Sequence, residues 1–117
     1  MQDSLENLKL TLQAFADERD WAQFHSPKNL SMAMIVEVAE LIELFQWNTE
    51  AESCELSDVK RMQVSNELAD TLVYLVRIAQ VLNIDLLEAT NNKIALNALK
   101  YPVEKVRGKN NKYTDYE

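Results

Sequence analysis

The chain has 117 residues, 47% of them apolar, and a net charge of −7, with one glycine, two prolines and one cysteine. This composition fits one globular domain rather than a disordered chain, and the scarcity of turn-forming residues favours helices over a many-stranded sheet. The negative charge disfavours nucleic acid as a partner, and no uncharged apolar stretch approaches the roughly 20 residues that cross a membrane.

The N-terminal part of the chain predicts an amphipathic helix followed by an aromatic loop. Met1–Leu10 has no basic segment before an apolar run, so we do not expect a signal peptide. From about Ser4 to Glu18, apolar residues recur every three or four positions, as in a helix with one apolar stripe. Asp20–Asn29 breaks this pattern with two aromatic residues, a histidine and a proline. We expect this segment to form an ordered loop that covers a pocket.

The second predicted helix, from about Leu30 to Trp47, is apolar on nearly all sides, which indicates burial nearly all round. Its only charges are Glu37, Glu40 and Glu43, which are three residues apart and therefore form one acidic line along the helix. A helix this apolar exceeds what a small monomeric bundle requires. We therefore expect a second subunit to cover part of it, in a symmetric homodimer or homotetramer.

An acidic stretch without periodicity, Asn48–Ser57, is predicted to be a linker. It contains Cys54, the only cysteine, so no internal disulfide can form and we expect a cytoplasmic protein. A third helix is predicted from about Asp58 to Leu82, and a fourth from a cap at Asp85 to about Leu99.

The C-terminal part is predicted to be an irregular tail over about 101–117, because the residue before Pro102 avoids helical dihedral angles. Residues 93–117 carry six basic and three acidic side chains, whereas residues 1–92 carry six basic and 16 acidic ones. Four helices with short links predict an all-α fold, a four-helix bundle that forms a single domain over residues 1–117.

Two acidic pairs lie on the predicted core helices: Glu37 with Glu40, and Glu67 with Asp70. Each pair is spaced i, i+3, so its carboxylates share one helix face. Carboxylates are rarely buried unless they are paired or bound to metal. Oxygen ligands favour Mg²⁺, with Mn²⁺ as a substitute, and such ions usually serve phosphate chemistry. Zinc and di-iron sites are disfavoured because His25 is the only histidine. A solvated acidic face is the alternative.

This spacing carries a family resemblance. Glu37-x-x-Glu40, 26 further residues and Glu67-x-x-Asp70 resemble the signature of the MazG-type all-α nucleotide pyrophosphohydrolases. Segments around it resemble the dCTP pyrophosphatase branch of that family, including its short bacterial members, and extend the resemblance to nearly the whole chain. These segments are Phe15–Trp21, Phe24–Leu30, Glu40–Trp47, Tyr101–Val103 and Lys112–Asp115.

The resemblance implies a catalytic centre and a reaction. Glu37, Glu40, Glu67 and Asp70 would bind Mg²⁺, and Glu43 would be an auxiliary ligand or the group that orients water. The implied enzyme is a nucleoside triphosphate diphosphatase that cleaves a dNTP, of the dCTP type, between its α- and β-phosphates. The products are the monophosphate and pyrophosphate, and the implied role is sanitation of the nucleotide pool.

The resemblance also implies substrate contacts. The spacing of Lys93, Asn97 and Lys100 places them on one helix face, and the family uses such a set for phosphates, with Arg107 and Lys112 following in the tail. Aromatic side chains would hold the base, with core packing as the alternative, and His25 is expected to hydrogen-bond within its loop, with substrate contact as the alternative. The aromatic candidates are Trp21, Trp47 and, four residues beyond Asp70, Tyr74.

Two other functions remain open at this point. One is the same chemistry on a different substrate, such as a damaged or purine nucleotide. The other is a non-catalytic helical module that regulates a partner protein, in which case the acidic residues would be dispensable.

Overall fold

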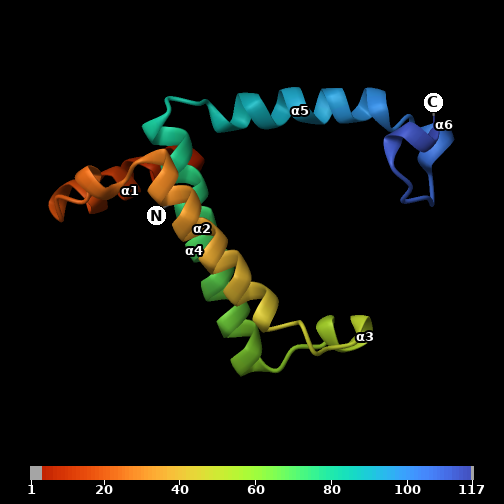
Figure 1. The fold of residues 1–117 in the computed structure, drawn as a ribbon, viewed down its shortest axis with the longest axis horizontal. Helices are drawn as coiled ribbons and strands as arrows, with labels where there is room; N and C mark the ends of the chain where they lie inside the picture. Colours follow the sequence, from red (N-terminus) through yellow and green to blue (C-terminus); the bar gives the residue numbers. More distant parts are fainter. Residues whose placement is uncertain (1–3, 117) are drawn as a thin grey trace. The chain divides into compact units, whose positions relative to one another are not determined.

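The computed structural model describes residues 4–116, which form two compact units divided between Asn83 and Ile84. All regular structure in the described part is helical, which confirms the all-α prediction (Figure 1). The first unit contains the helices α1 (Leu5–Glu18), α2 (Pro27–Glu43), α3 (Glu50–Ser53) and α4 (Asp58–Val81), and the short 3₁₀ helix η1 (Ala22–Phe24). The second contains α5 (Leu86–Lys100), α6 (Val103–Val106) and the 3₁₀ helix η2 (Tyr113–Tyr116).

The helix α2 begins three residues earlier and ends four residues earlier than predicted. Ser26 caps it by accepting a hydrogen bond from the Asn29 N–H at 3.1 Å, and Pro27 is compatible with the first turn, where its missing N–H has no partner to lose. After Glu43 the helical bonds give way to tighter turns, with the Phe45 N–H donating to the Ile42 carbonyl at 2.9 Å. The last four residues of the predicted helix therefore do not continue its face.

The predicted linker and tail are more regular than the sequence suggested. Thr49 opens α3 with a reciprocal capping box, in which its N–H donates to Glu52 Oε1 at 2.8 Å and its Oγ1 accepts from the Glu52 N–H at 3.1 Å. In the tail, Tyr101 packs edge-to-face against Tyr113 and Tyr116, with centroids 6.4 and 6.3 Å apart. The expectation of an irregular tail was wrong for α6 and η2, because these aromatic contacts order the segment.

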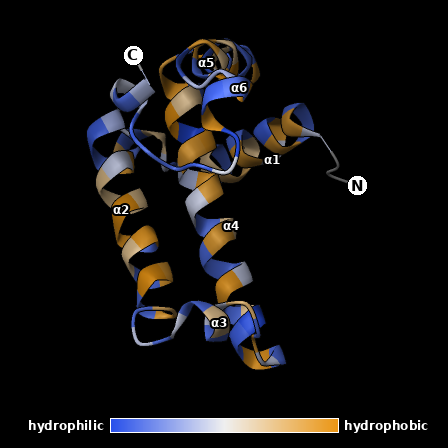
Figure 2. Cartoon of the chain, turned by 90° about the vertical axis from the view of Figure 1, so that its right-hand side faces the viewer, coloured by the Kyte–Doolittle hydropathy of each residue, from blue (hydrophilic) through white to orange (hydrophobic). Residues whose placement is uncertain are grey.

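In the first unit, α2 lies alongside α4, and α1 packs against α4 (Figures 1 and 2). The buried apolar residues of these helices are Ala16 of α1, Leu30 of α2, and Val76 and Ala79 of α4. No helix within residues 4–116 has the length and apolar character needed to cross a membrane. The four-helix bundle and the single domain stay predictions, because α5 belongs to the second unit.

The prediction that α2 is buried nearly all round was wrong within this chain. Only Leu30 is buried among its residues, and the apolar stripe facing away from α4 is 53–61% exposed. Figure 2 shows the hydrophobic residues running along this helix. Within residues 4–83, the extensive packing of α2 is against one helix, α4. The exposed stripe consists of Met32, Ile35, Val36 and Ile42.

Candidate functional site

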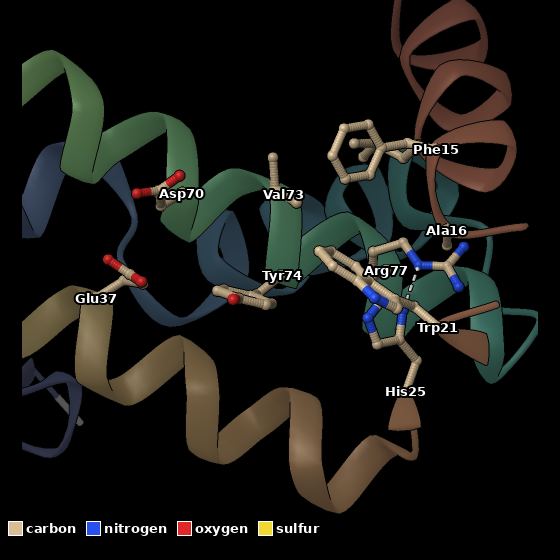
Figure 3. Close-up of a pocket in the computed structure, with 10 residues that line it drawn as sticks. Phe15, Ala16, Trp21, His25, Glu37, Asp70, Val73, Tyr74 and Arg77 are labelled. Carbon is tan, nitrogen blue, oxygen red and sulfur yellow. Dashed lines mark hydrogen bonds between the residues drawn. The ribbon is translucent and has the colours of Figure 1, made fainter. Parts of the chain in front are cut away.

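Carboxylates from α2 and α4 converge between these two helices. One carboxylate oxygen from each of Glu37, Glu67 and Asp70 lies within 4.8 Å of the other two. Glu67 and Asp70 share a face of α4 because they are three residues apart, and Figure 3 shows Glu37 of α2 turned toward Asp70. Three of the four predicted metal ligands therefore meet at one place.

The electrostatics of this cluster are those of crowded acids. The pKa of Glu37 is raised from its ordinary 4.5 to about 7. The largest cause is the neighbouring Glu67 carboxylate, to which a protonated Glu37 can donate, followed by burial. A hydrogen bond to Glu40 and the charges of Glu40 and Asp70 raise the pKa of Glu37 further. Glu40, the fourth predicted ligand, is exposed and is not part of the three-carboxylate cluster, although its side chain contributes to the raised pKa of Glu37.

One atom of the cluster lacks a partner. Within the described residues, Glu67 Oε2 is buried and accepts no hydrogen bond. A buried carboxylate oxygen without a donor or cation is costly, by roughly 1–3 kcal/mol or more for a charged group. A divalent cation would satisfy this oxygen and relieve the repulsion, and an all-oxygen donor set suits Mg²⁺ or Mn²⁺. The residues present therefore fit such an ion.

A cavity of about 400 Å³ extends from the carboxylates to an aromatic end (Figure 3). Trp21 stands at that end, edge-on to the Phe15 ring at 5.7 Å and to the His25 ring at 6.2 Å between centroids. The site thus joins a charged end to an apolar end, as a ligand with both kinds of group requires. The lining residues are Leu12, Phe15, Ala16, Trp21, His25, Glu37, Asp70, Val73, Tyr74 and Arg77.

Comparison with known proteins gives the site its context. Residues 32–116 match the MazG-like family. This chain belongs to that family. It is 42% identical to dCTP pyrophosphatase 1 of Rattus norvegicus and 40% identical to that of Homo sapiens, over 97% of this chain and 68% of each relative. A crystal structure of a pyrophosphatase from Archaeoglobus fulgidus matches with a TM-score of 0.79 and 39% identity, over 84% of this chain and 92% of that one.

These matches confirm the MazG-type resemblance and the enzyme class, a nucleoside triphosphate diphosphatase. They also set the alternative of a non-catalytic interaction module aside.

Of the predicted base contacts, Trp21, His25 and Tyr74 line the cavity and Trp47 does not. Trp47 is 87% exposed in the turn after α2. The prediction placed it two helical turns beyond Glu40 on the same face, but α2 ends at Glu43 and that relation is lost. Glu43 itself is exposed and outside the three-carboxylate cluster. The structure of the first unit therefore brings one of the two tryptophans to the site.

The predicted phosphate contacts lie in the second unit. Lys93, Asn97 and Lys100 are exposed on α5, and Arg107 and Lys112 are exposed in the segment that follows. Lys100 Nζ lies 4.9 Å from the centroid of the Tyr113 ring, a cation–π distance. Their contact with phosphate stays a prediction.

Sequence reasoning missed five of the cavity residues: Leu12, Phe15, Ala16, Val73 and Arg77. Phe15 and Leu12 read as ordinary members of an apolar stripe. Arg77 carried a usable signal, because it is the only basic residue between Met62 and Val81 and lies seven residues beyond Asp70. This spacing returns it to the acidic face of α4.

Proposed function

We propose that this protein is a Mg²⁺-dependent pyrophosphohydrolase that cleaves dCTP, or a close analogue of it, to the monophosphate and pyrophosphate. The observation that carries the proposal is the carboxylate cluster, with its buried unpartnered oxygen on Glu67, beside a cavity that Glu37 and Asp70 line and that has an aromatic end. The curated relatives are named for dCTP, which supports the choice of base. The proposed role is sanitation of the cytoplasmic nucleotide pool.

In this proposal the carboxylate end of the cavity binds the cation and the aromatic end binds the base. Glu37, Glu67 and Asp70 hold the cation, with Glu40 as a fourth ligand. Bound Mg²⁺ supplies neutralisation of phosphate charge and a water of lowered pKa. Trp21 and Tyr74 offer ring faces and edges to the base, so that the α-phosphate is positioned beside the carboxylates. We assign Glu43 to orienting water, and Lys93, Asn97, Lys100, Arg107 and Lys112 to the phosphates.

Hydrolysis in ¹⁸O-labelled water tests the position of cleavage. With Mg²⁺ and a panel of pyrimidine and purine triphosphates, the protein should release pyrophosphate and put the label into the monophosphate, because water attacks the α-phosphorus. Mass spectrometry of both products gives the answer. Orthophosphate as the first product, or label in the pyrophosphate, would contradict the proposed cleavage between the α- and β-phosphates. Preferred cleavage of a purine nucleotide would contradict the choice of dCTP as substrate.

We also propose that a second copy of the chain covers the exposed stripe of α2. Met32, Ile35, Val36 and Ile42 recur at helical spacing and are each more than half exposed, an arrangement that a water-facing helix rarely shows. A twofold interface brings the same stripe of two copies together, and Ile35 lies against its own counterpart or a near neighbour. The assembly is a homodimer, or a homotetramer built from two such dimers.

Ile35→Glu should break this assembly. A charge in the middle of the apolar stripe would be buried without a partner. The dissociation constant of the oligomer should therefore rise at least tenfold. Light scattering coupled to size-exclusion chromatography measures the mass. Thr11→Glu, which adds the same charge at an exposed site on α1, is the matched control. A monomeric wild-type protein at micromolar concentration would refute the interface.

A further inference from the structure

Arg77 is the one buried charged residue within the described part of the chain, at 3% exposure. Its guanidinium is surrounded by neutral acceptors: Nη1 donates to Gln13 Oε1 at 3.0 Å and to Gln80 Oε1 at 2.9 Å, and Nε donates to His25 Nδ1 at 3.3 Å. No carboxylate lies within ion-pair distance of it among residues 4–116. A buried cation without an anion is costly, so its retention calls for a function.

The bond to His25 determines where the imidazole carries its proton. Arginine has five N–H donors and no acceptor, so the nitrogen it contacts must offer a lone pair. Nδ1 of His25 is therefore unprotonated and the proton of the neutral ring resides on Nε2. Burial, and after it the positive charge of Arg77, also lower the pKa of His25, which keeps the ring neutral near pH 7.

The cavity side of His25 is then a hydrogen-bond donor only. Figure 3 shows the Nδ1 edge of the ring turned to Arg77, with the opposite edge toward the part of the cavity that contains Tyr74 and the carboxylates. A donor held in this way favours binding of a base that presents an acceptor to it. It disfavours a base that presents another donor, since a buried N–H facing an N–H leaves both unpaired. Cytosine presents acceptors at both O2 and N3, whereas uracil and thymine carry a proton on N3.

We infer that Arg77 is a positioning residue that fixes His25 as an Nε2–H donor and thereby makes the cavity select cytosine over uracil and thymine. The inference rests on the proposed function for its substrate, but the state of His25 can be measured without any substrate. The contacts of Arg77 with Gln13 on α1 and Gln80 on α4 hold the guanidinium in place from two helices. Gln80 is itself anchored through its bond to the Lys9 carbonyl at 2.9 Å.

The proton position can be read directly in the wild-type protein. His25 is the only histidine, so the ring ¹⁵N signals of a ¹⁵N-histidine sample are unambiguous. We expect the shifts of a neutral Nε2–H tautomer at pH 7, and a shift toward a mixture of tautomers in Arg77→Met. A wild-type ring that is an imidazolium, or protonated on Nδ1, would overturn the inference.

The selectivity is tested with dCTP, dUTP and the deoxynucleotide of pyrimidin-2-one, which keeps the N3 acceptor of cytosine but lacks its amino group. We expect the wild type to cleave the pyrimidin-2-one nucleotide more nearly like dCTP than like dUTP. Arg77→Met should lower the kcat/KM ratio of dCTP to dUTP by about tenfold or more, because the released ring can accept from the N3 proton. Arg77→Lys, which keeps a cationic donor, should retain more of the ratio.

Arg61→Met is the matched control, since Arg61 is exposed on the same helix. Arg77→Met could instead lower kcat/KM equally for all three nucleotides and leave the ratio of dCTP to dUTP unchanged. That result would indicate a purely structural residue and overturn the inference, but it would leave the proposed function intact. If Arg77→Met does not fold, two measurements on the wild type still test the inference: the tautomer of His25, and the comparison of the pyrimidin-2-one nucleotide with dCTP and dUTP. Failure of the wild type to release pyrophosphate from any nucleotide would overturn the proposed function as well.

Discussion

Asp70→Asn should lower kcat/KM for the nucleotide by about 10²–10³, the usual effect of removing one preorganised group that stabilises charge at a reacting phosphate. Asparagine keeps the size of aspartate and one oxygen ligand but removes the negative charge that holds the cation. Asp70 is the exposed member of the cluster, so the change should leave the packing of α4 on α2 intact. Pyrophosphate release over a range of Mg²⁺ concentrations measures the effect.

The Mg²⁺ dependence separates two causes of that loss. If the variant mainly binds the ion less tightly, raising Mg²⁺ should restore part of the activity. Glu55→Gln provides the control, because Glu55 is an exposed acid in the link before α4 and neutralising it changes the net charge by the same amount. An Asp70→Asn enzyme within about threefold of wild type at all Mg²⁺ concentrations would show that the acidic cluster is not the metal centre.

Local rules predicted the helices and the acidic cluster well, because both depend on residues close in sequence. The i, i+3 spacing of Glu67 and Asp70 determines their shared face once α4 exists, and the cap predicted at Asp85 sets the start of α5 at Leu86. The convergence of α2 on α4 was predicted from the acidic pairs inside two apolar helices, together with the family resemblance. It held because carboxylates inside apolar helices have few other stable places.

Prediction failed where one element depends on another. The helix α2 was extended to Trp47 because its apolar period continues to that residue, but the chain turns after Glu43 and Thr49 then starts a new helix. Arg77 was overlooked because a single arginine in an apolar segment looks like an exposed charge until Gln13, from a helix more than sixty residues earlier, is seen to accept from it. Such partners have no local signature.

Mg²⁺ should stabilise the protein, and more so at pH 8 than at pH 5.5. In the metal-free fold the pKa of Glu37 is raised to about 7, so the protonated form is the one that the fold favours. The contribution of this group to stability is therefore fully present below its ordinary value of 4.5 and is lost as the pH rises through 7. Mg²⁺ requires deprotonated ligands, so it binds best where the metal-free cluster is least stable.

Thermal unfolding in EDTA and in Mg²⁺, at both pH values and one protein concentration, measures this coupling. Mg²⁺ at ten times its dissociation constant contributes about 1.4 kcal/mol, which for a domain of this size raises Tm by about 5 °C. Ionic strength is matched with NaCl, since salt alone screens the carboxylates. Glu37→Gln should raise the metal-free Tm at pH 8 and remove most of the gain from Mg²⁺, because the amide relieves the repulsion and takes away a ligand. A shift from Mg²⁺ that is equal at both pH values and persists in Glu37→Gln would mean that the ion binds elsewhere.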